Sequence, residues 1–169
     1  NEDGAKVVSE HKGRFGLVAV LPIPDIDASL REIAYAFDTL RADGVGLLTS
    51  YGNIWLGDKS LQPIFDELNR RNAVVYSHPT DAACCHNLLP DTPPTSVEWN
   101  TDTSRAIYSM INEGPQAGRG GTGGSAATRY GNIRFIWSHA GGSLLGLIGR
   151  FLGGTASQES LGRPPEANS

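Results

Sequence analysis

Two histidines stand at equivalent places in this sequence, each near the end of an apolar run that reads as a buried strand. His78 belongs to the stretch VVYSHPT and His139 to the stretch FIWSHAG, and each follows a serine and precedes a strand-breaking turn. A neutral imidazole at the end of a buried strand suits metal binding or proton transfer near neutral pH. Each could instead only hydrogen-bond a loop, but two at equivalent strand ends favour a shared chemical role.

The elements that must position these histidines alternate between strands and helices. Four apolar runs have the character of buried parallel strands: 15–22, 45–50, 73–79 and 133–140. Apolar residues at helical spacing predict helices between them, the first with Asp27 as its N-cap and Gly44 at its end. Further helices are predicted around 61–68, from Asp102 or Thr103 to about Asn112, and over 144–152. This alternation is the βαβ signature.

Four such β/α units fit either an open doubly wound sheet or part of an eight-fold (β/α) barrel. A complete barrel takes roughly 250 residues, so this chain of 169 residues is long enough for about half to two-thirds of one. In both architectures ligands bind beyond the carboxyl ends of the strands. We therefore expect His78 and His139 on one edge of the sheet, close enough to share a site.

Composition excludes several classes of function. The net charge is −4 and no basic patch stands out, which argues against nucleic acid as a partner. The sequence contains no run of 18 apolar residues, so it predicts no membrane-spanning helix. Ser77 and Ser138 lack the pattern around a nucleophilic serine, so serine hydrolysis has little support.

The cysteines and the two ends of the chain carry further expectations. Cys84 and Cys85 are adjacent, a spacing that rarely forms a disulfide, so we expect free thiols and a cytoplasmic setting. The chain opens at Asn1 without a signal peptide, which reads as an interior start. A glycine-rich loop is expected over 117–127, and residues 153–169 read as an irregular tail outside a domain of residues 1–152.

Longer motifs resemble a known family. YSHPT, followed about 60 residues later by IRFIWSHAGGSLLGLIGR, is similar to the amidohydrolase-related decarboxylases. This family includes aminocarboxymuconate-semialdehyde, γ-resorcylate and 6-methylsalicylate decarboxylases. The stretch from Gly13 to Asp58 resembles the same family, and its 6-methylsalicylate branch most of all. The resemblance covers about residues 1–152.

The resemblance implies a distorted (β/α)₈ barrel with one divalent metal, zinc or manganese. His78 matches the metal-binding histidine of the family, and His139 matches the histidine that donates a proton or activates water beside the metal. Arg150 matches a recurrent arginine that could be structural or could pair with a carboxylate. Asn53 and Trp55 fall where the family lines its substrate pocket.

The family pattern is incomplete in this chain. An H-x-H motif on the first strand and a late aspartate, which complete the metal site in the family, are absent from this sequence. The expected function is metal-dependent decarboxylation of a small hydroxyaromatic acid, with a homodimer as the expected assembly. The alternatives are hydrolysis of a lactone or amide on the same barrel, and a truncated relative that only binds such an acid or a partner chain.

Overall fold

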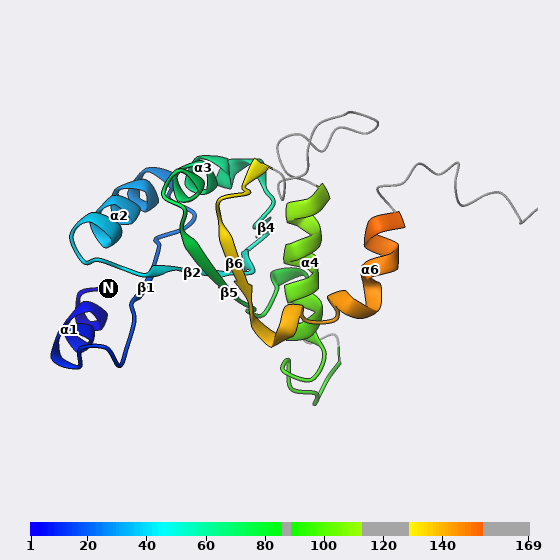
Figure 1. The fold of residues 1–169 in the computed structure, drawn as a ribbon. Coiled ribbons are helices and arrows are strands. Elements are labelled where there is room, and N and C mark those ends of the chain that lie inside the picture. The colour runs from blue at the N-terminus through cyan, green and yellow to red at the C-terminus, as the bar shows by residue number, and fades with distance from the viewer. Residues whose placement is uncertain (86–88, 113–128, 154–169) are drawn as a thin grey trace, which may run out of the picture.

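The computed structural model describes residues 1–85, 89–112 and 129–153 (Figure 1). The helices are α1 (Glu2–Glu10), α2 (Ile26–Asp38), α3 (Gln62–Arg70), α4 (Glu98–Asn112) and α6 (Leu144–Gly153). The strands are β1 (Val18–Val20), β2 (Gly44–Leu48), β3 (Ser50–Tyr51), β4 (Ile54–Trp55), β5 (Val74–His78) and β6 (Arg134–Trp137). Short 3₁₀ turns are η1 (Lys59–Leu61), η2 (Ala83–Cys85) and η3 (Ser138–Gly141). The glycine-rich segment 117–127 and the tail 154–169 lie outside the described residues.

Four parallel strands form one sheet in the order β1-β2-β5-β6, so each strand lies beside the next one predicted from the sequence. Helices α2 and α3 cover one face of this sheet. Buried side chains fill the space between them, including Ile33 of α2, Phe65 of α3, and Val45 and Val75 of the central strands. The expected βαβ architecture is confirmed over these residues.

Over the described residues, the other face of the sheet lies open. Strand register places Val20, Gly46, Tyr76 and Ile136 in one row across all four strands. Two members of the row are exposed apolar side chains, Val20 at 64% and Ile136 at 52%. Because side chains alternate between the faces of a strand, the next row on this face contains Leu48 and His78, which are direct partners at the carboxyl ends of β2 and β5.

Helix boundaries differ from the predictions at three points. Asp25, not Asp27, caps α2, since its carboxylate accepts a 2.9 Å hydrogen bond from the Ala28 amide. Helix α2 ends at Asp38, and Gly44 is the first residue of β2 instead of the end of the helix. Glycine is needed at this position because a side chain would collide with the Val74 carbonyl of β5. Helix α4 begins at Glu98, one turn earlier than predicted.

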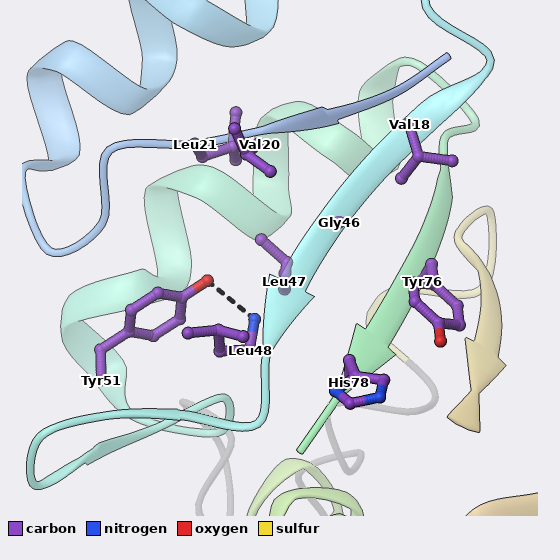
Figure 2. A pocket seen from close by; sticks show the side chains of 9 residues that line it. All are labelled: Val18, Val20, Leu21, Gly46, Leu47, Leu48, Tyr51, Tyr76 and His78. Atoms are coloured by element: carbon purple, nitrogen blue, oxygen red, sulfur yellow. Dashed lines mark hydrogen bonds between the residues drawn. The ribbon is translucent and has the colours of Figure 1, made fainter. Parts of the chain in front are cut away.

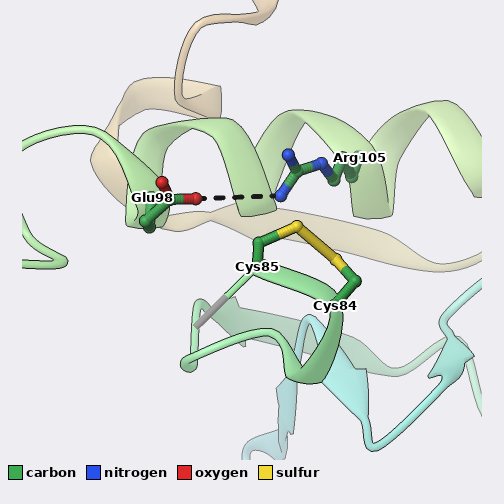
Figure 3. The surroundings of a disulfide bond; sticks show 4 residues. All are labelled: Cys84, Cys85, Glu98 and Arg105. Atoms are coloured by element: carbon green, nitrogen blue, oxygen red, sulfur yellow. Dashed lines mark ion pairs between the residues drawn. A yellow bond between two sulfur atoms is a disulfide. The ribbon is translucent and has the colours of Figure 1, made fainter. Parts of the chain in front are cut away.

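The expectation of free thiols is wrong. Cys84 and Cys85 are joined in a disulfide within η2, beside the Glu98–Arg105 ion pair of α4 (Figure 3). With these cysteines paired, the cytoplasmic location has no support from free thiols and stays a prediction. No helix of the described residues has both the length and the apolar character needed to cross a membrane.

Candidate functional site

The two histidines come together at the carboxyl edge of the sheet, as the sequence predicts. Their ring centroids lie 5.4 Å apart with the planes inclined by 68°. Neighbouring strands deliver them: β5 ends at His78, while β6 pairs with β5 in parallel and leads into η3, which carries His139. Their convergence is therefore a consequence of parallel pairing between two strands with similar endings.

The main chain around His78 fixes its imidazole. The Nδ1 atom lies 2.8 Å from the carbonyl oxygen of Pro79. A carbonyl can only accept, so Nδ1 carries the proton in this bond, and in the neutral imidazole the lone pair is on Nε2. The Thr49 amide, just beyond β2, donates a 3.0 Å hydrogen bond to the His78 carbonyl. The His78 side chain thus presents one basic nitrogen from a held backbone.

His139 occupies an unusual backbone conformation. It has φ 53° and Ala140 has φ 52°, so two successive residues with side chains lie in the left-handed region. Such residues cost roughly 1–2 kcal/mol each and persist where the surroundings fix them. Gly141 and Gly142 follow with positive φ, and the close approach of Gly142 to the Asn100 carbonyl holds the turn against α4. This turn carries the His139 imidazole past the strand end toward His78.

The indole ring of Trp99 packs against the imidazoles of both His78 and His139. Its ring centroid lies 5.4 Å from that of His78 and 5.8 Å from that of His139, edge-on to both. The indole Nε1 donates a 3.4 Å hydrogen bond to Asp81, in the loop that follows β5. Sequence reasoning missed Trp99 because it placed the start of the helix beyond this residue.

An apolar cavity of about 460 Å³ lies over the open face of the sheet and reaches His78 (Figure 2). Its lining residues come from β1, β2, β5 and the start of the β3–β4 hairpin: Val18, Val20, Leu21, Gly46, Leu47, Leu48, Tyr51, Tyr76 and His78. Gly46 stands between Val20 and Tyr76 in the strand row, so its missing side chain opens the centre of the cavity. This volume is in the usual range for small-molecule pockets.

The Tyr51 hydroxyl forms the polar corner of this cavity. It accepts a 2.9 Å hydrogen bond from the Leu48 amide, which satisfies the last backbone donor of β2 (Figure 2). Burial raises the pKa of Tyr51 above its ordinary value, although the Leu48 bond lowers it. The phenol therefore stays protonated and retains its O–H as a donor.

The other three predicted site residues lie away from this cavity. Asn53 is exposed at the tip of the β3–β4 hairpin, and Trp55 is half-buried on β4 against the hydrophobic core. Arg150 is exposed on α6. Their role in substrate binding stays a prediction, and from the same loop the structure brings Tyr51 to the cavity instead.

A buried carboxyl group lies beneath the site and was also missed. Asp102 of α4 is 1% exposed and accepts a hydrogen bond from the Thr49 hydroxyl. Burial raises the pKa of Asp102, against the hydrogen bonds from Thr49 and the Thr80 backbone, which lower it. No local pattern in the sequence marks Asp102, because its contact with Thr49 depends on where α4 docks.

Comparison with known proteins agrees with this geometry. The sequence profile of the amidohydrolase family matches residues 1–153. The chain belongs to the amidohydrolase family. Its fold, four parallel strands with helices on one face, is therefore part of the (β/α)₈ barrel of these amidohydrolases.

Individual relatives include decarboxylases. The chain is 37% identical to decarboxylase yanB of Aspergillus niger, over 83% of this chain and 38% of that protein. It is 35% identical to 6-methylsalicylic acid decarboxylase of Penicillium expansum, over 89% of this chain and 44% of that protein. A dihydroxybenzoic acid decarboxylase from Polaromonas, solved with manganese and the inhibitor 2-nitroresorcinol, superposes with a TM-score of 0.72 at 17% identity, covering 99% of this chain and 49% of that one. The chain thus spans less than half the length of these relatives.

The described residues do not bring together a set of side chains that could hold a metal ion by itself. Among them, no three His, Cys, Asp or Glu side chains come together in a group that could hold an ion. His78, with its free Nε2, has the chemistry of one ligand. The described part of the chain alone therefore does not make a complete divalent-metal site.

Proposed function

We propose that this chain is part of an enzyme that catalyses the non-oxidative decarboxylation of a small hydroxyaromatic acid of the salicylate type. The observation that carries the proposal is the pair of imidazoles, with ring centroids 5.4 Å apart, of which His78 lines an apolar cavity of about 460 Å³. The names of the relatives, which include a 6-methylsalicylic acid decarboxylase, support the same reaction class.

The cavity suits an aromatic ring more than an extended polar substrate. Its walls are aliphatic at Val18, Val20 and Leu48 and aromatic at Tyr76, and the opening over Gly46 leaves room for a flat group. Burying such a ring against these walls supplies affinity from apolar area. The ring's carboxylate would then face His78 and His139, where the cavity meets the carboxyl ends of the strands.

Decarboxylation needs a proton on the ring carbon that loses CO₂. The bond between that carbon and the carboxylate breaks, its electron pair stays on the ring, and a proton takes the vacated position. We assign this proton to the His139 imidazole, since His78 uses Nδ1 to bond the Pro79 carbonyl. A positioned imidazole of this kind contributes about 10²–10⁴-fold to a rate.

We assign His78 as one ligand of a divalent metal, zinc or manganese. Imidazole nitrogen suits both ions, and the Pro79 carbonyl sets the tautomer that leaves Nε2 available. When bound, such an ion would withdraw electron density from the carboxylate and phenolic oxygens. The remaining ligands would come from outside the described residues.

We also propose that the protein associates as a homodimer. Over the described residues β1 and β6 end the sheet, and each carries an exposed apolar side chain, Val20 on β1 and Ile136 on β6. Exposed apolar strand edges favour association with another chain.

Product analysis with the full-length protein tests the proposed reaction. Incubation with 6-methylsalicylate should release CO₂ and the corresponding phenol, while a lactone or anilide of similar size should remain intact. Hydrolysis of the lactone without CO₂ release would instead favour the hydrolase alternative, and binding of the acid without turnover would favour a binding protein.

Two variants separate proton transfer from ring binding in the same assay. His139→Asn should lower kcat by about 10²–10⁴-fold with little change in KM. Gly46→Val should mainly raise KM, because its side chain fills the centre of the cavity. Wild-type kinetics in both variants would contradict the placement of the substrate.

A further inference from the structure

Asp102 is a buried carboxyl group to which the proposed chemistry gives no task. It lies on α4, 1% exposed, and accepts a hydrogen bond from the Thr49 hydroxyl. Thr49 is itself fully buried and follows the last residue of β2. A buried carboxyl group is costly unless it is well bonded, so this contact between α4 and the end of β2 needs an explanation.

The contact leads directly to His78. Thr49 uses its hydroxyl toward Asp102 and its amide toward the His78 carbonyl, over 3.0 Å. This amide bond extends the β2–β5 ladder one step beyond the last register pair, Leu48 with His78. Pro79, which directly follows the last residue of β5, supplies the carbonyl that accepts the hydrogen bond from His78 Nδ1. Through Thr49, Asp102 is thus two hydrogen bonds away from the main chain of His78, and the Thr80 backbone, in the peptide that begins with the Pro79 carbonyl, bonds Asp102 as well.

The same turn of α4 also contacts the two imidazoles directly, through Trp99. Trp99 precedes Asp102 by three residues, which places both on one face of α4. Its indole lies edge-on to His78 and to His139, with ring centroids 5.4 and 5.8 Å away. A bond that fixes Asp102 to β2 therefore also fixes the position of Trp99 over the site.

We propose that Asp102 is a positioning residue of this site: its bond to Thr49 fixes the main chain of His78 and holds Trp99 against both imidazoles. The inference rests on the proposed function for its catalytic consequence, but the orientation of His78 can be measured without any reaction. Groups of this kind, which orient a ligand or catalytic side chain from behind, are worth about 10–100-fold in activity or metal affinity.

Four variants isolate the Asp102–Thr49 bond. Asp102→Ala and Thr49→Val each remove it, and Thr49→Val keeps the shape of the side chain. Asp102→Asn keeps an oxygen that can accept from Thr49, and Thr49→Ser keeps the hydroxyl. Thr103→Val is the matched control, since Thr103 is equally buried on α4 but bonds its hydroxyl to the Trp99 carbonyl within the helix.

The primary measurement is the tautomer of His78, read from its imidazole ¹⁵N chemical shifts in the metal-free labelled chain. Wild type, Asp102→Asn, Thr49→Ser and Thr103→Val should show the Nδ1–H tautomer. Asp102→Ala and Thr49→Val should shift His78 toward a mixture of tautomers. In the full-length enzyme these two variants should lower kcat about 10–100-fold, while KM changes much less than kcat.

The two readouts keep this inference separate from the proposed reaction. A tautomer shift in Asp102→Ala and Thr49→Val supports the positioning role even if the wild-type protein decarboxylates nothing, in which case the proposed function alone fails. Unchanged His78 signals in Thr49→Val and Asp102→Ala overturn the inference, whether or not activity falls. The same shift in Thr103→Val would also overturn it, because the effect would then belong to α4 in general.

Discussion

At the scale of single residues, some side chains of the site can be predicted from the sequence and others cannot. His78 and His139 could be predicted because each follows an apolar run and precedes a turn, and parallel pairing then brings the rings to 5.4 Å. Trp99 and Asp102 could not, because their roles depend on where α4 docks, and no local pattern records that position. Tyr51 reaches the cavity through a backbone bond to Leu48 that only the fold reveals.

A single carboxylate away from the site gives a pH-dependent prediction. Glu67 of α3 accepts hydrogen bonds from Arg70 and Arg71, and these lower its pKa from 4.5 to about 2. Arg71 also bonds Asp38 at the end of α2, so the cluster joins the two helices. A lowered folded-state pKa stabilises the protein above the unfolded value, and this stability is lost as the pH falls from about 4.5 toward 2.

We therefore expect Glu67→Gln to reduce the free energy of unfolding by about 1 kcal/mol at pH 7, a value discounted for partial exposure. The difference from wild type should shrink below pH 4.5 and vanish near pH 2, as measured by urea unfolding across this pH range. Glu10→Gln is the matched control, because its partner Lys6 is exposed at 3.9 Å and the pair contributes little. A constant difference at every pH would contradict the assignment.

At the scale of elements, the docking of α4 onto η3 holds the two halves of the site together. The Ser143 amide donates a 3.2 Å hydrogen bond to the Asn100 carbonyl, and the hydroxyls of Ser104 and Ser143 lie 3.1 Å apart. Gly142 has φ 65° and leaves no room for a side chain against Asn100. From the sequence, this place is only a Gly-Gly turn. The need for glycine at Gly142 comes from its contact with Asn100 of α4, which is distant in the sequence.

Two glycine variants test this docking. Gly142→Ala should destabilise the protein by about 2–4 kcal/mol, because the methyl group enters the Asn100 carbonyl and the left-handed backbone disfavours alanine. Gly146→Ala, inside α6 with open space around it, should stabilise by about 0.5–1 kcal/mol. Urea unfolding of both variants gives the values; equal effects of the two changes would contradict the close packing at Gly142.

At the scale of the whole molecule, the alternation of strands and helices predicts the fold well, and the boundaries less well. The four parallel strands occur where apolar runs predict them, although one face of β1 and β6 is exposed at Val20 and Ile136. The prediction fails at Gly44 and at Cys84–Cys85, where contacts between distant backbones or between adjacent sulfurs decide the outcome. The open sheet face could also be anticipated, since four β/α units make only part of a barrel.

The open face and the sheet edges predict self-association of this 169-residue chain. Ile136→Lys places a charge in the exposed row opposite Tyr76, outside the residues that line the cavity, and should shift the protein from dimer to monomer. Val7→Lys, at an exposed position of α1 away from the sheet, should leave the dimer intact. Sedimentation velocity at micromolar concentration distinguishes the two; monomeric wild type, or identical behaviour of both variants, would contradict the predicted dimer interface.

The most direct test of the central claim is the product formed by the full-length protein in D₂O, analysed by proton NMR. We expect the wild type to convert 6-methylsalicylate into a phenol that carries deuterium at the carbon that lost CO₂. His139→Gln should form this product at least about 10²-fold more slowly while still binding the acid. Deuterated phenol formed by His139→Gln at the wild-type rate would contradict the role of the imidazole pair. Absence of CO₂ and of deuterated product in the wild type would contradict decarboxylation itself.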